Sequence, residues 1–180
     1  AGFFALGGYG SAILATRYGV PPWLSLPAAC AAVTLLALLI GRPTLRLKGH
    51  TLAMATLGLG IIVSIVVATE DRLTGGPDGM AVPALVLLGW TVSGERSWYW
   101  IVGAVLLATV WLALNLIESP TGRALRALHG SEVAAQTLGI SAARYKLQVF
   151  VLSALIAAFA GALTAHYAGF ITPAKASFMH

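Results

Sequence analysis

The segment WYWIVGAVLLATVWLALNLI, Trp98–Ile117, decides the fold. It contains no Asp, Glu, Lys or Arg over 20 residues. A helix needs about 20 mostly apolar residues to cross the hydrocarbon core of a bilayer, so we predict that this segment spans a membrane. Three more uncharged segments predict further spans: Trp23–Ile40, Gly49–Ala68 and Leu147–Ala168. Residues Ala1–Thr16 predict the end of a fifth span.

The composition agrees with this prediction. Hydrophobic residues make up 58% of the chain and charged residues only 9%, whereas soluble domains carry about 25% charged residues. We therefore predict an all-α, polytopic integral membrane helical bundle that forms a single domain over residues 1–180. The net charge of +5 comes from residues beside the spans, which favours contact with membrane lipid and gives no reason to expect nucleic acid. The sequence begins without Met, and we expect it to be part of a longer chain.

Lysine and arginine set the orientation, because cytoplasmic loops are enriched in them. Two connections, 41–48 and 118–146, are basic, whereas the connection 69–97 between them carries more acids than bases. We predict that the first two are cytoplasmic and that 69–97 is extracytoplasmic. The basic residues are Arg42, Arg46, Lys48, Arg123, Arg126, Arg144 and Lys146, and the charged residues of 69–97 are Glu70, Asp71, Arg72, Asp78, Glu95 and Arg96.

Aromatic residues gather near the predicted outer boundary, as in an interfacial belt; they are Trp23, Trp90, Trp98, Tyr99 and Trp100. The apolar run Met80–Val92 is too short to span and contains Pro83, so we predict an interfacial or re-entrant segment.

Small residues recur every fourth position in the last span, which predicts close helix packing. These rows are Ala154, Ala158, Ala162 and Ala157, Gly161, Ala165. The lone Cys30 lies in an apolar run and is predicted to be a packing residue.

The connection 118–146 reads as a pair of short helices. The first is predicted over Gly122–His129, ended by Gly130. Ser131 is a good N-cap for a second helix over Glu132–Leu138. Gly139 suits the turn after this helix, and Ser141 is placed to cap the next one. Two small side chains, Ala134 and Ala135, are expected to be exposed and to allow docking into a groove, with Glu132 pairing with a basic residue of a partner. The alternative is a solvated linker.

The stretch EVAAQTLGI resembles the Glu-Ala-Ala loop of bacterial ABC importer permeases. The wider stretch GRALRALHGSEVAAQTLGISAARYKLQVFVLSALIAAFAGALTAHYAGFITP resembles the LivM-type permease of branched-chain amino acid importers, as do LRLKGHTLAMATLGLG, LTGGPDGM and AGFFALGGYGSA. Val133 separates Glu132 from the alanines and departs from the general pattern. The resemblance implies that the loop couples to an ATPase through Arg123, Glu132, Ala134, Ala135 and Gly139.

By the same resemblance, the chain is expected to be a permease subunit in the bacterial cytoplasmic (inner) membrane and not an enzyme. Its expected partners are a second permease subunit, two cytosolic ATP-binding subunits and an extracytoplasmic substrate-binding protein. No cofactor is expected on this chain, because ATP binds to the partner subunits. Urea and short amides are alternative substrates within the same family.

The stretch TGGPDG in the outer connection predicts a tight turn. Its functional interpretation is a periplasmic lip where substrate is delivered, formed by Thr74, Gly75, Gly76, Asp78 and Gly79; the alternative is a simple turn.

His50 and His166, near span ends, are expected to be interfacial. The spans contain no acidic or basic residue other than histidine, which disfavours an ion-driven carrier. A secondary carrier or channel stays open as an alternative, and a membrane scaffold without transport activity is a third possibility.

Overall fold

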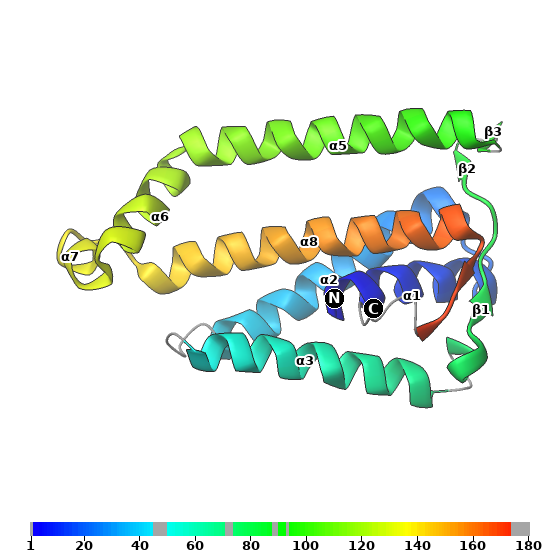
Figure 1. Cartoon of the computed structure of the whole chain (residues 1–180), viewed down its shortest axis with the longest axis horizontal. Helices are drawn as coiled ribbons and strands as arrows, with labels where there is room; N and C mark the ends of the chain where they lie inside the picture. The colour runs from blue at the N-terminus through cyan, green and yellow to red at the C-terminus, as the bar shows by residue number, and fades with distance from the viewer. Residues whose placement is uncertain (1, 45–49, 71–73, 88–89, 93, 174–180) are drawn as a thin grey trace.

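The computed structural model describes residues 2–44, 50–70, 74–87, 90–92 and 94–173. Helices dominate this part of the chain (Figure 1), which confirms the all-α class. The helices are α1 (Gly2–Arg17), α2 (Pro22–Thr44), α3 (His50–Thr69), α5 (Glu95–Glu118), α6 (Pro120–Gly130), α7 (Glu132–Thr137) and α8 (Ala142–Ala168). The short elements are the 3-10 turn η1 (Gly76–Asp78) and the strands β1 (Met80–Ala81), β2 (Val86–Leu87), β3 (Trp90–Thr91) and β4 (Phe170–Ile171).

Among the described residues, three helices are long and apolar enough to cross a membrane: Pro22–Pro43, Glu95–Glu118 and Ala142–Ala168. They contain three of the predicted spans and extend each of them by a few residues. Helix α3 begins at His50, and its apolar described part is Leu57–Thr69. The predicted spans therefore correspond to real helices, and the chain is a multi-pass membrane protein.

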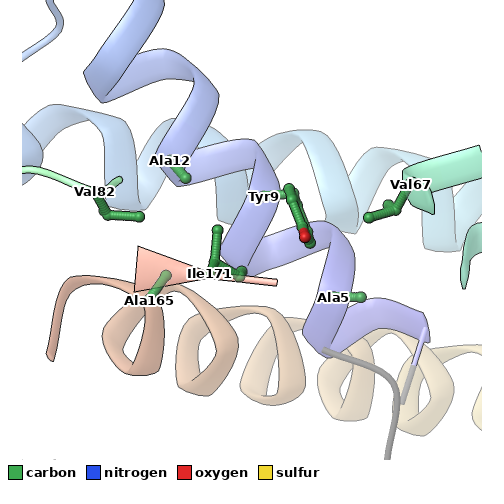
Figure 2. Packing of buried hydrophobic residues seen from close by; sticks show 7 residues of the cluster. All are labelled: Ala5, Tyr9, Ala12, Val67, Val82, Ala165 and Ile171. Carbon is green, nitrogen blue, oxygen red and sulfur yellow. The ribbon is translucent and has the colours of Figure 1, made fainter. Parts of the chain in front are cut away.

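The core lies where α1, α2 and α8 pack together. Gly7 and Gly161 make this packing possible: a Cβ on Gly7 would meet the Ala158 backbone, and a Cβ on Gly161 would meet the Phe4 carbonyl. The small-residue rows of α8 therefore lie at the closest helix contact, as predicted. Figure 2 shows one part of this core, where Tyr9 of α1 packs with apolar side chains from α3, α8 and β4. Cys30 is buried beside Val33 and Ala158, in agreement with a packing role.

The two ends of the bundle differ. At one end lie α6, α7, the end of α2 and the beginning of α3; at the other lie η1 and the strands β1, β2, β3 and β4 (Figure 1). We call these the inner and outer ends, following the orientation predicted from the basic residues. The basic and acidic residues Arg46, Lys48, Asp71 and Arg72 lie outside the described residues. The separation of the predicted cytoplasmic and extracytoplasmic connections agrees with the alternation of the spans.

The described part of the segment that we predicted to be interfacial or re-entrant, residues 80–87 and 90–92, is extended and crosses the outer end (Figure 1). Strand β1 pairs antiparallel with β4, and β2 pairs antiparallel with β3. Val82 and Leu85 of this segment are buried against the helices. The structure therefore supports the interfacial alternative, in which Pro83 interrupts the strand pairing. We call residues 80–87 the outer strap.

The aromatic residues of the predicted belt are not equivalent. The side chains of Trp23, Tyr99 and Trp100 are exposed, as an interfacial belt requires. Trp98, in contrast, is buried and makes an edge-to-face contact with Tyr167, with ring centroids 5.3 Å apart. Its assignment to the belt was wrong because the first turn of α5 faces the end of α8. The Trp90 side chain lies outside the part that the structure describes.

Candidate functional site

The inner end carries a compact unit formed by α6, α7 and the first turns of α8, which we call the inner module. Helix α6 begins at Pro120, two residues earlier than predicted, because the Ser119 side chain accepts a hydrogen bond from the Gly122 amide at 3.2 Å. Ser131 ends α6 and starts α7, since its Oγ accepts from the Ala134 amide at 3.2 Å. The predicted N-cap at Ser131 is confirmed. Ser141 stands at the N-cap position of α8 without a side-chain capping bond.

Helix α7 ends in a tight reversal at Gly139. This glycine has a φ of +82°, which non-glycine residues adopt at a cost. The Gly139 amide donates to the Gln136 carbonyl and the Ile140 amide donates to the Ala135 carbonyl, both at 3.0 Å. These two bonds define a Schellman motif. The predicted turn at Gly139 is therefore confirmed, and it directs the chain from α7 straight into α8.

A small apolar core holds the inner module together. Ala135 is only 2% exposed and packs with Leu128 and Ala142, while Ile140 and Tyr145 cover the cluster. The expectation that Ala135 is exposed for docking was wrong, because the reversal at Gly139 folds α8 against that side of α7. Ala134, on the other side, is exposed as expected.

Glu132 has a partner within the chain. Its Oε2 lies 2.8 Å from the Lys146 Nζ, and both side chains are 35% exposed. The ion pair joins the first turn of α7 to the beginning of α8. The carboxylate therefore holds α7 in place, at a helix N-terminus where an acid is also favoured by the helix dipole, and its pairing with a base on another subunit stays a prediction.

Two arginines join α6 to the end of α5. Arg123 Nη1 donates to the Glu118 carbonyl at 3.0 Å, and Arg126 Nη2 donates to the Ile117 carbonyl at 3.1 Å. The last carbonyls of a helix have no partner within it, so both contacts stabilise the inner end of α5. The predicted coupling residue Arg123 thus acts as a brace between helices.

The residues that the sequence analysis missed are large and apolar. Val133 is 74% exposed and Leu138 is 80% exposed, although both lie outside the spans. In the sequence, Val133 was noted only because it separates Glu132 from the two alanines and departs from the general pattern. Its position directly after a capped helix start was the available signal, since the N-cap fixes which side chains of a six-residue helix point outward. The tip of the inner module therefore presents two apolar side chains flanking the small Ala134.

The second predicted set lies at the opposite end of the bundle, so the structure does not bring the two sets together (Figure 1). Thr74 is buried, and its Oγ1 lies 2.7 Å from both the Val67 and Glu70 carbonyls. The Gly76 amide donates to the same Oγ1 at 3.3 Å.

The backbone conformation of this turn explains why its three positions are occupied by glycine. Gly75, Gly76 and Gly79 all have positive φ, and a Cβ on Gly79 would meet the Ile171 carbonyl of β4. Asp78 is exposed. The turn is a rigid connection packed against β4, and its role as a lip stays a prediction. Within the described ranges, no group of three or more His, Cys, Asp or Glu side chains is placed to hold a metal ion.

Comparison with known proteins identifies one family. The family model described as branched-chain amino acid transport system / permease component matches residues 1–179. Over 98% of its length the chain is 34% identical to the high-affinity branched-chain amino acid transport system permease protein LivM of Escherichia coli (strain K12), covering 47% of that protein.

Two archaeal proteins of Methanocaldococcus jannaschii are also similar. The probable branched-chain amino acid transport permease protein LivM is 27% identical over 69% of this chain and 36% of its own length. The corresponding LivH protein is 28% identical over 88% of this chain and 53% of its own length. The chain spans about half the length of these relatives or less. No solved structure matches the chain significantly.

Proposed function

The chain belongs to the family of branched-chain amino acid transport system permease components, and on this basis we propose that it is part of the membrane-spanning subunit of an ATP-driven importer. The proposed substrates are branched-chain amino acids, and the proposed location is the bacterial cytoplasmic membrane. Three apolar helices of spanning length support the membrane role. The names of the relatives support the substrate class.

The proposed partners follow from this role. The relatives include permeases of two names, LivM and LivH, which supports pairing with a second permease subunit. ATP would bind to two cytosolic subunits that contact the inner module. A substrate-binding protein would approach the outer end, near the turn that contains the exposed Asp78.

The observation that carries the proposal is the exposed apolar tip of the inner module. Exposed Val133 and Leu138 stand on a helix that is capped at both ends and supported by its own core. Burying such a side chain on a partner contributes about 1.5–3 kcal/mol. The tip therefore fits an apolar groove on an ATPase subunit, in the manner of a helix whose side chains anchor in a groove.

The supports of the tip explain how its movement would reach the membrane. The turn at Gly139 and the Glu132–Lys146 ion pair join α7 to α8. Arg123 and Arg126 join α6 to the last carbonyls of α5. A displacement of α7 by the closing ATPases would thus be transmitted to the inner ends of α5 and α8, because the turn, the ion pair and the two arginine contacts join the inner module to both helices.

The test replaces each anchor by serine, in Val133→Ser and Leu138→Ser, within the complete transporter. Each variant should lose about tenfold or more in affinity for the ATPase subunits, because a loss of about 1.4 kcal/mol corresponds to a factor of ten. Co-purification and substrate-stimulated ATP hydrolysis measure the loss. Ala127→Ser, at an exposed position of α6, is the control and should behave like the parent. Normal ATPase binding by both anchor variants would contradict the proposal.

One observation favours a proton-driven secondary carrier as the second candidate. His166 is ionisable, only 3% exposed and located in α8, and buried ionisable residues often mark proton pathways. The expectation that His166 is interfacial was wrong, because the outer strap covers it. The dependence of uptake on ATP or on the proton gradient separates the two candidates. Competition of labelled leucine uptake by urea or acetamide separates the alternative substrates.

A further inference from the structure

Three buried polar side chains meet near the outer end of the tightest helix contact. They are Ser11 of α1, Ser25 of α2 and His166 of α8, with exposures of 0%, 0% and 3%. Ser11 Oγ lies 3.0 Å from Ser25 Oγ and 2.9 Å from His166 Nε2. His166 Nδ1 lies 2.9 Å from the carbonyl oxygen of Pro83 in the outer strap. A continuous chain of hydrogen bonds thus connects three helices to the strap.

The donor and acceptor of each of these hydrogen bonds follow from the Pro83 carbonyl, at which the series ends. The Pro83 carbonyl can only accept, so Nδ1 must carry the hydrogen, and in a neutral ring Nε2 must then accept. Ser11 therefore donates to Nε2. Its single hydrogen is used, so Ser25 must donate to Ser11, sharing its hydrogen with the Pro22 carbonyl at 3.2 Å. The hydrogen bonds thus run from Ser25 to Ser11, from Ser11 to His166 and from His166 to the outer strap, and the neutral ring with hydrogen on Nδ1 is the form that bonds to the strap.

The outer strap has few other bonds to the helices. The Val82 amide donates to the Gly169 carbonyl at 2.9 Å, and the Thr16 hydroxyl donates to the Ala81 carbonyl at 3.1 Å. Strand β1 adds a two-residue pairing with β4. Among the described residues, the side chain of His166 is thus one of a small number of polar groups that fix the strap over α1, α2 and α8, in addition to the buried apolar side chains of Val82 and Leu85.

The strap contacts the first turn of α5. The Val92 amide donates to the Leu85 carbonyl at 2.8 Å, and Leu85 packs with Trp98 in the first turn of α5. Trp98 is the buried residue of α5 among those that the structure describes. With 24 residues, α5 is about 36 Å long at 1.5 Å per residue, and its inner end is braced to α6. The strap and the inner module therefore lie at opposite ends of one stiff, lightly packed helix (Figure 1).

We propose that His166 is a positioning residue that latches the outer strap onto the bundle, and that the strap is released when α5 is displaced from its inner end. The latch is the Nδ1–H bond to Pro83, and the two serines set the ring so that Nδ1 faces the strap. Release would uncover the outer ends of α1, α2 and α8. This part of the inference rests on the proposed function, because transport supplies the displacement of α5.

Two conservative substitutions separate the latch from a general need to fill the core. The amide nitrogen of asparagine lies close to the position of Nδ1 and can donate as Nδ1–H does, whereas the side-chain amide of glutamine reaches the position of Nε2, where its Oε1 can accept from Ser11. His166→Asn should therefore keep the bond to Pro83 and lose the bond to Ser11, and His166→Gln should do the reverse. A role in core packing alone would not favour asparagine, since glutamine is closer to histidine in volume.

The readout is the accessibility of the strap. In full transporter complexes with Cys30→Ala, a Val82→Cys change places a thiol at a position that is 6% exposed. An impermeant maleimide should label it at least about tenfold faster with His166→Gln than with His166. With His166→Asn the rate should stay within about threefold of the His166 protein. Equal acceleration by both changes, or faster labelling with asparagine, would overturn the latch. This readout needs no transport, so it stands even where ATP-driven uptake fails.

An engineered disulfide between β1 and β4 tests the release of the outer strap without changing His166. Ala81 and Phe170 are paired across β1 and β4 and both are exposed, and paired positions of antiparallel strands lie within the Cα separation of a disulfide. Ala81→Cys with Phe170→Cys should form a disulfide and lower uptake at least about tenfold, with ATPase binding retained and uptake restored by reductant. Each single cysteine is the control. Failure to form the bond, or parental uptake in the oxidised protein, would overturn the inference.

Discussion

Reversing the charge of Glu132 should weaken the inner module, and reversing Lys146 as well should restore it. The two charged groups are 2.8 Å apart with side chains 35% exposed, and ion pairs this accessible contribute about 0.2–1 kcal/mol. Glu132→Lys removes the pair, places two cations together and loses the acid at the N-terminus of α7, which is worth about 0.3–1 kcal/mol. We expect a combined loss of about 1–2 kcal/mol, a factor of about 5–30 in the population of the ordered module.

The assay measures ATPase co-purification and amino acid uptake with the complete transporter. Glu132→Lys should lower both by several fold, and Glu132→Lys with Lys146→Glu should recover most of the loss, except for the helix-dipole contribution. His129→Lys adds a positive charge at an exposed position of α6 and should behave like the parent. If the double reversal is as impaired as Glu132→Lys alone, the carboxylate acts on a partner subunit and the intrachain pair is not its role.

Three further predictions concern packing, topology and energy. Gly7→Leu should lower the thermal midpoint of the purified protein by an amount equivalent to about 1–3 kcal/mol or more, because a Cβ at this position meets the Ala158 backbone. Gly103→Ala is the control and should leave the thermal midpoint unchanged, because no atom lies within 4 Å of its added Cβ. In a Cys30→Ala background, an impermeant maleimide should label Ser97→Cys but not Thr137→Cys in intact cells, and the reverse result would invert the predicted orientation. In vesicles that hold the full complex, a protonophore should leave ATP-driven uptake largely intact; uptake that needs the gradient and ignores ATP would favour the carrier.

The sequence was sufficient where the physical cause is local. Span length, the cap at Ser131 and the reversal at Gly139 each depend on a few consecutive residues, and the structure confirms all three. The small-residue rows of α8 were also readable, because their spacing of four residues places them on one face of a helix. What a local pattern cannot give is the identity of the residue on the other side of each contact.

The contacts that the sequence did not predict are all long-range. Lys146 is 14 residues from Glu132 in the chain and returns beside it after the turn, so Glu132 has an intrachain partner, and its pairing with a base on another subunit stays a prediction. Ala135 was expected to be exposed, but Ala142 covers it. His166 was expected to be interfacial, but it bonds to Pro83, 83 residues earlier. In each case the polar or small residue was recognised, and its partner depended on the tertiary fold.

Hydropathy also could not rank the spans by how tightly they pack. Helices α2, α5 and α8 have nearly equal hydropathy, yet 39%, 0% and 28% of their apolar windows are buried. In water, the hydrophobic effect would favour burial of an apolar face as exposed as that of α5. Lipid tails are as apolar as leucine, so close helix packing in a membrane depends on small residues and hydrogen bonds. Gly7, Gly161 and the Ser11–His166 bond supply these between α1 and α8. Among the described residues, α5 makes no such contact along its middle, and the proposed displacement of α5 would therefore break few contacts between the described spans.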